Sequence, residues 1–68
     1  MFQRNEFEAE VKRNGLTIKA VAQAIGIDTA TLYRKMSGNG DFYRNEIEKL
    51  IRLLNLSGEA VVRIFFAS

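Results

Sequence analysis

Apolar residues recur along this chain with a period close to 3.6, and no stretch shows sustained alternation with a period of two. This pattern predicts five short helices, over residues 5–13, 18–25, 29–37, 44–53 and 58–66. Tight turns are expected between them, because the chain has five glycines and no proline. The sequence therefore predicts an all-α fold.

The residues at the predicted helix starts are mostly good N-caps. Asn5 is followed three residues later by Glu8, which is the spacing of a capping box. The fourth helix begins less favourably, with Tyr43 where Ser or Thr is usual, although Glu46 is placed to reach back to it. The candidate N-caps of the first four helices are Asn5, Thr17, Asp28 and Tyr43.

The predicted third helix is much less apolar than the second. The second helix has a full apolar stripe, made by Ile18, Val21, Ala22 and Ile25. The third helix has only Leu32 and Met36 on its inward face, and its other residues are polar or small. We therefore expect the third helix to bury one narrow edge and to display a broad surface for binding.

Positive charge is concentrated in the middle of the chain. Residues 12–40 contain five Lys and Arg residues against Asp28 alone, a local charge of +4, whereas residues 1–11 carry −2 and residues 41–68 carry zero. The whole chain is therefore only +2 at pH 7. A basic patch of this kind favours a polyanionic partner such as nucleic acid.

The chain has no Cys and no His. Their absence excludes disulfides, thiolate and imidazole metal sites, Cys nucleophiles and a Ser–His dyad. With no motif for catalysis, a cofactor or a small-molecule substrate, we expect no enzyme. No apolar run approaches the roughly 20 residues of a membrane span, and the acidic N-terminal segment does not resemble a signal peptide. Because the lack of cysteine fits a reducing compartment, we expect a cytoplasmic protein with no membrane contact, metal or cofactor.

Residues 18–36 form the most distinctive pattern in the chain. Ala22 stands where a small side chain lets two helices approach closely, and Gly26, four residues later, permits a positive φ in a very short turn. Leu32 continues the apolar seam that the two helices would share. This spacing is typical of a helix-turn-helix, in which the second helix of the pair projects and can enter the major groove of DNA.

The segment TIKAVAQAIGIDTATLYRKM, residues 17–36, resembles the helix-turn-helix of small phage-encoded regulators of the Cro/repressor type, which have a lambda-repressor-like domain. The likeness continues through residues 42–47, 54–57 and 64–66. It implies a single domain over residues 1–68, folded as a compact five-helix bundle. It also implies that the protein binds double-stranded operator DNA in the control of lysogeny, usually as a homodimer.

The resemblance assigns roles to particular residues. The base-reading residues would be Thr29, Ala30, Thr31 and Arg34. The phosphate contacts would come from Thr17, Lys19, Gln23, Tyr33, Lys35, Asn39 and Arg44. Side-chain chemistry agrees with these roles, because arginine can fork onto guanine O6 and N7 and methyl groups can meet the thymine methyl. The free N–H groups at the start of the second helix likewise favour an anion.

A second interpretation is a protein-binding modulator that keeps this fold but docks on a repressor protein. Asp28 lies at the groove-facing edge with the wrong charge for DNA, unless its carboxylate is engaged in capping the third helix. The start of the second helix also lacks the Gln that is often found there in the family. In the simplest interpretation, Arg34 and Lys35 are solvated charges, and Tyr33 packs over the following loop.

Two adjacent rings near the C-terminal end of the chain cannot both be buried easily on one helical face. Phe65 continues the apolar stripe of the fifth helix and is expected in the core, so Phe66 and Val62 point partly outward. Exposed apolar residues in a small protein often mark contacts. Val62, Phe65 and Phe66 are therefore candidates for a subunit interface, and the alternative is packing of the chain end against Phe2 or Phe7.

Overall fold

The computed structural model describes residues 1–66, which form helices and no strand. The helices are α1 (Arg4–Arg13), α2 (Ile18–Ile25), α3 (Thr29–Met36), α4 (Arg44–Leu54) and α5 (Gly58–Val61), and α5 continues into a π-helical turn, η1 (Val62–Phe66). The predicted all-α fold is confirmed. Residues 67 and 68, which the domain expected over residues 1–68 includes, lie outside the described residues. Across residues 1–66, no helix has the length and apolar character needed to cross a membrane.

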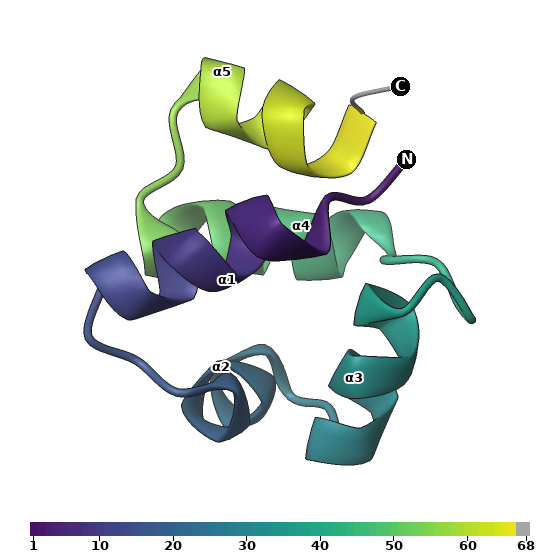
Figure 1. Ribbon diagram of the computed structural model, residues 1–68. Coiled ribbons are helices and arrows are strands. Elements are labelled where there is room, and N and C mark those ends of the chain that lie inside the picture. The colour runs from purple at the N-terminus through teal and green to yellow at the C-terminus, as the bar shows by residue number, and fades with distance from the viewer. Residues whose placement is uncertain (67–68) are drawn as a thin grey trace.

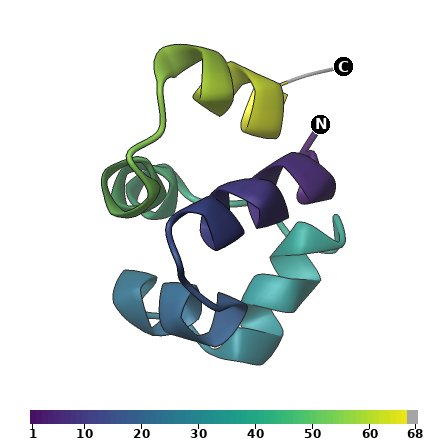
Figure 2. The same ribbon diagram turned by 60° about the vertical axis from the view of Figure 1, so that its left-hand side comes forward.

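The helices lie in three levels. α1 and α4 form the middle of the molecule, α5 and η1 cover one side of this pair, and α2 and α3 cover the other (Figures 1 and 2). One core of apolar side chains lies between the levels, and its fully buried members are Phe7, Val21, Ala22, Leu32, Leu50, Leu54 and Ile64. Because residues of α3 and η1 belong to the same core, the position of α3 depends on the whole bundle.

The N-cap residues predicted from the sequence are found at some helix starts and not at others. Thr17 caps α2 as predicted, because its Oγ1 accepts a hydrogen bond from the Ala20 N–H at 3.1 Å. The N-cap predicted at Asn5 is wrong, because Asn5 lies inside α1, whose N-cap is Gln3. Asp28 stands at the N-cap of α3 as predicted, but its side chain makes no capping hydrogen bond. The carboxylate of Asp28 is therefore exposed, and it has no partner among residues 1–66.

The two ends of the described chain are held together. The Gln3 N–H donates to the carbonyl oxygen of Ile64 at 2.7 Å. Beside this bond, four rings cluster with centroids 4.9–6.4 Å apart, those of Phe2, Phe7, Phe42 and Phe65. Phe65 is half-buried in this cluster, whereas Phe66 is 64% exposed and Val62 is 57% exposed. Phe66 has its ring contact with Phe65, at 6.5 Å, and does not pack against Phe2 or Phe7.

Candidate nucleic-acid interface

The turn between α2 and α3 depends on one glycine. Gly26 ends α2 with φ +84°, in the left-handed region, and both its N–H and that of Ile27 donate to the Ala22 carbonyl at 3.0 Å. A Cβ at Gly26 would meet no atom within 4 Å, so the backbone conformation and not lack of space requires glycine here. The turn brings Leu32 of α3 into the core beside α2. As a result α3 crosses α2 at a large angle (Figure 1).

The outward face of α3 is centred on two residues one turn apart, Ala30 and Arg34, which are both exposed. They lie opposite the buried face of the helix, which is formed by Leu32, Lys35 and Met36. Thr29 and Thr31 flank them on either side and are half-buried. Of the four expected base-reading residues, Ala30 and Arg34 therefore lie on the outward face of α3, and Thr29 and Thr31 lie at its edges. The guanidinium of Arg34 has no hydrogen-bond or ion-pair partner among residues 1–66.

Six of the seven expected phosphate contacts are exposed, namely Thr17, Lys19, Gln23, Tyr33, Asn39 and Arg44. Lys19 and Gln23 lie one turn apart on the outer face of α2, and within the described residues neither side chain has a partner. The Thr17 oxygen accepts the capping bond, which leaves its hydroxyl proton free to donate. Arg44 is paired with Glu48 on its own helix at 3.7 Å, where both side chains are exposed.

The seventh expected phosphate contact, Lys35, is corrected by the structure. Lys35 is only 6% exposed, and its Nζ donates to Glu46 Oε1 at 2.8 Å and to the Asp41 carbonyl at 3.0 Å. The same ammonium lies 4.1 Å from the centre of the Tyr43 ring. A cation held by these partners inside the bundle does not reach a phosphate at the surface. The sequence carried no local sign of this, because Glu46 is eleven residues away and the intervening loop brings it close.

Glu46 is a buried carboxylate held by several donors. Its Oε1 accepts from Lys35 Nζ and from the Tyr43 N–H, the latter at 2.9 Å. Burial alone would raise the pKa of Glu46, but these two hydrogen bonds and the positive charges of Lys35 and Lys49 outweigh that effect. The pKa of Glu46 therefore lies below its ordinary value. No buried side-chain nitrogen or oxygen in the described part of the chain lacks a hydrogen-bond partner.

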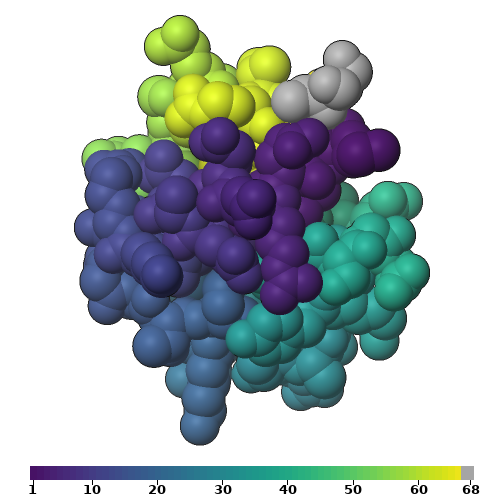
Figure 3. Space-filling view, viewed as in Figure 1, coloured from purple at the N-terminus to yellow at the C-terminus, as the bar shows by residue number. Residues whose placement is uncertain are grey.

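One cation beside α3 was missed by sequence reasoning. The guanidinium of Arg4, from the start of α1, lies 5.8 Å from the centre of the Tyr33 ring and donates to Ser37 Oγ at 3.3 Å. It also pairs with Glu8 at 3.2 Å. The N-terminal segment lies directly against the surface formed by α3 and the following loop (Figure 3). Nothing in the local sequence indicates this contact, since 33 residues separate Arg4 from Ser37.

Comparison with known protein families supplies the deciding observation. A family model described as a helix-turn-helix domain matches residues 6–63, which covers most of the chain and all of α2, the turn and α3. The chain belongs to the helix-turn-helix domain family. No curated protein matches the sequence. Membership of this family gives the protein the generic helix-turn-helix fold of a DNA-binding domain.

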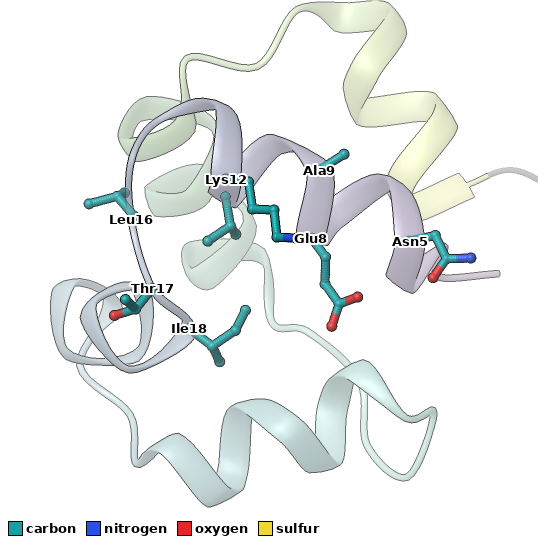
Figure 4. A pocket seen from close by; sticks show the side chains of 8 residues that line it. Asn5, Glu8, Ala9, Lys12, Leu16, Thr17 and Ile18 are labelled. Atoms are coloured by element: carbon teal, nitrogen blue, oxygen red, sulfur yellow. The ribbon is translucent and has the colours of Figure 1, made fainter.

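The helix-turn-helix domain also has a groove beside the motif. It has a volume of about 620 Å³ and runs between α1 and the start of α2, as the side chains in Figure 4 show. Val11, Leu16 and Ile18 give it apolar walls, and Glu8 and Lys12 add charge to them. Thr17 also lines it, so the groove adjoins the start of α2 and does not cut into the outward face of α3. Among residues 1–66 there is no cluster of three or more potential metal ligands.

Proposed function

We propose that this protein is a sequence-specific transcriptional regulator of the phage Cro/repressor type, which reads operator DNA by placing α3 in the major groove. The observation that carries the proposal is the outward face of α3, where Ala30 and Arg34 are exposed and the Arg34 guanidinium has no hydrogen-bond or ion-pair partner among residues 1–66. Arg34 would donate two hydrogen bonds to guanine O6 and N7, and the methyl groups of Ala30 and Thr29 would meet thymine methyls.

The backbone of the duplex would be held on both sides of α3. Thr17, Lys19 and Gln23 would contact phosphates from the α2 side, together with the free N–H groups at the start of that helix. Tyr33, Asn39 and Arg44 would do so from the other side. Arg4 joins this second group, because its guanidinium already lies beside the Tyr33 ring. Lys35 is left out because its ammonium is buried.

The regulator would act as a homodimer on a pseudo-palindromic operator. Val62 and Phe66 are exposed apolar side chains four residues apart on η1, and the half-buried Phe65 lies beside them. η1 does not lie over α2 or α3, so a partner chain seated on Val62 and Phe66 would leave α3 uncovered (Figure 2). The proposed dimer requires a twofold axis that brings the α3 helices of both copies to the same side. Two copies would present their α3 helices to successive major grooves about 34 Å apart.

The decisive experiment is in vitro selection from random duplex DNA at physiological salt, with the purified protein alone. The expected result is enrichment of a twofold symmetric motif whose half-sites lie about 10 base pairs apart. Weak, salt-sensitive binding with no enrichment would contradict the proposal, because phosphate contacts alone give that behaviour.

Variants of single cations then test the assigned face. Arg34→Ala should weaken operator binding by about 1–3 kcal/mol and relax the preference at one base position, whereas Lys19→Ala should weaken all sequences alike and lower the salt slope by about one. The matched control is Arg52→Ala on α4, since Arg52 is also exposed and has no partner within residues 1–66. Equal effects of the two arginine variants on base preference would show that α3 is not the reading helix.

A second candidate function is that of a modulator that binds a repressor protein. Asp28 favours it, because an exposed carboxylate without a capping bond at the start of α3 repels phosphate and suits a basic protein surface. Measuring DNA affinity with and without a candidate repressor distinguishes the two. Tight, sequence-specific binding by the purified protein alone would count against the modulator.

A further inference from the structure

The Lys35–Glu46 pair joins the last turn of α3 to the first turn of α4. Both side chains are 7% exposed, and the Nζ–Oε1 distance is 2.8 Å. The ammonium has a second acceptor, the Asp41 carbonyl in the loop between the helices, and the Tyr43 ring covers a third direction. Glu46 in turn accepts from the Tyr43 N–H. This ion pair therefore holds the end of α3, the loop between α3 and α4, and the start of α4 in fixed positions relative to one another.

α3 packs on α2, and its last turn is also held by buried Met36 and by Arg4, which contacts Tyr33 and Ser37. The Lys35–Glu46 pair is the buried polar contact that joins this turn to α4. The loop also lies against the Lys35 stem, because a Cβ added at Gly40 would be 3.6 Å from Lys35 Cγ. Arg34, the exposed cation of the outward face, is the residue directly before Lys35 in the same helical turn. A change in how Lys35 is held would therefore act on the same helical turn that carries Arg34.

Stability alone does not explain a buried ion pair at this position. The cost of removing two charges from water often equals or exceeds their attraction, and apolar side chains of similar volume commonly replace such pairs without loss of stability. What an apolar pair lacks is directional bonding. The ammonium of Lys35 bonds to Glu46 and to the Asp41 carbonyl in defined directions, whereas packed Met and Leu side chains have no such directional bonds.

We propose that Lys35 and Glu46 are positioning residues that set the orientation of α3 for sequence-specific recognition, and that neither touches the DNA. The link to recognition rests on the proposed function. The orientation of α3 in the free protein does not depend on the proposed function, and it can be measured without DNA.

The test is the double variant Lys35→Met/Glu46→Leu, measured beside the wild type. The variant removes one positive and one negative charge, so the net charge stays +2 and no proposed phosphate contact is lost. We expect an unchanged salt slope and cooperative unfolding with a melting temperature at most about 4–8 °C below that of the wild type, since the variant leaves the Tyr43 N–H without its acceptor. We expect the ratio of operator affinity to non-specific affinity to fall about tenfold or more, comparable to one or more mismatched base pairs. A ratio that stays within about twofold of the wild type overturns the proposal.

Glu46→Gln is the companion variant, and it should behave in the opposite way. The amide oxygen still accepts from Lys35 and from the Tyr43 N–H, so the geometry is kept while the buried ammonium loses its counter-charge. We expect a lower melting temperature and a specificity ratio like that of the wild type. A loss of specificity in folded Glu46→Gln would show that the charge of Glu46, and not the bonding geometry, is what recognition needs. An unfolded double variant would show that the pair serves stability. Either result would overturn the proposal.

Residual dipolar couplings of the free proteins separate this proposal from the proposed function. In the double variant, the couplings of residues 33–36 should no longer fit the wild-type orientation, while those of α1, α2 and α4 should still fit it. Unchanged couplings overturn the positioning role. If the wild type selects no DNA sequence but the couplings of α3 change as expected, the positioning role stands and the DNA-reading function fails.

Discussion

Gly26 offers the sharpest test of why this chain makes its turn between α2 and α3. Replacing Gly26 with Ala adds a methyl group where nothing lies within 4 Å, so no steric clash contributes. The only unfavourable effect of the substitution is that alanine must adopt the φ of +84°. A left-handed conformation costs an L-residue about 1–2 kcal/mol, and the reduced freedom of the unfolded chain returns about 0.4–1 kcal/mol. Gly26→Ala should therefore destabilise the fold by about 1 kcal/mol.

Gly58 provides the matched control. It is the first residue of α5, it has no positive φ, and an added Cβ there also meets nothing within 4 Å. Gly58→Ala should stabilise the protein by about 0.4–1 kcal/mol through the same effect on the unfolded chain. That effect cancels when the two variants are compared, so their difference, about 1–2 kcal/mol, measures the strain at Gly26 alone.

Urea denaturation followed by circular dichroism gives both values, and thermal melting should separate the two variants by about 5–15 °C for a domain of this size. The reasoning is refuted if Gly26→Ala and Gly58→Ala change the free energy of unfolding equally. It is also refuted if Gly26→Asn is worse than Gly26→Ala, because Asn tolerates the left-handed region better than Ala does.

Three further predictions follow from single groups. Thr17→Ala should lower the free energy of unfolding by about 1 kcal/mol through loss of the cap on α2, and Thr17→Ser should restore it in the same urea titration. The lowered pKa of Glu46 makes its ionised form stabilising at pH values above the unfolded pKa of about 4.3, and this contribution is lost as the pH falls through the folded pKa. Acid titration of stability should accordingly show a shallower loss in Glu46→Gln than in the wild type, and parallel curves would contradict the assignment. Phe66→Ser should abolish the proposed dimer in sedimentation equilibrium without lowering the melting temperature of the monomer, since the side chain is 64% exposed; a dimer that persists would place the interface elsewhere.

Much of the fold follows from local rules that the sequence displays. Apolar periodicity located α2 and α4 almost to the residue, because each has a continuous inward stripe. The turn was predictable from Ala22 and Gly26, since few residues accept a positive φ at the end of a helix. Burial of Leu32 and Met36 followed from their spacing, and this also determined which face of α3 would point outward.

The errors arise where distant segments meet. Asn5 was expected to begin the first helix, but the helix starts one residue earlier, directly after Gln3, whose N–H is bonded to the Ile64 carbonyl of η1. Lys35 lies at the margin of a narrow apolar stripe, where periodicity does not distinguish a solvated cation from a buried one. Its burial depends on Glu46, which the loop brings near. The helix predicted over residues 58–66 changes to π-helical geometry at Val62, a change that apolar spacing does not reveal.

The bond between Gln3 and Ile64 has a consequence for how the chain acquires its native state during synthesis. It joins segments that are 61 residues apart in the sequence, and Ile64, which is fully buried, fills the core from η1, which is translated after α2 and α3. The segment with α2, the turn and α3 leaves the ribosome well before that side chain does. Closing such a long loop is entropically costly until its contacts form, so the bundle is completed late. The nascent chain therefore contains α2 and α3 before Ile64 is available to complete their core, and under the proposed function DNA recognition would begin only after η1 has docked.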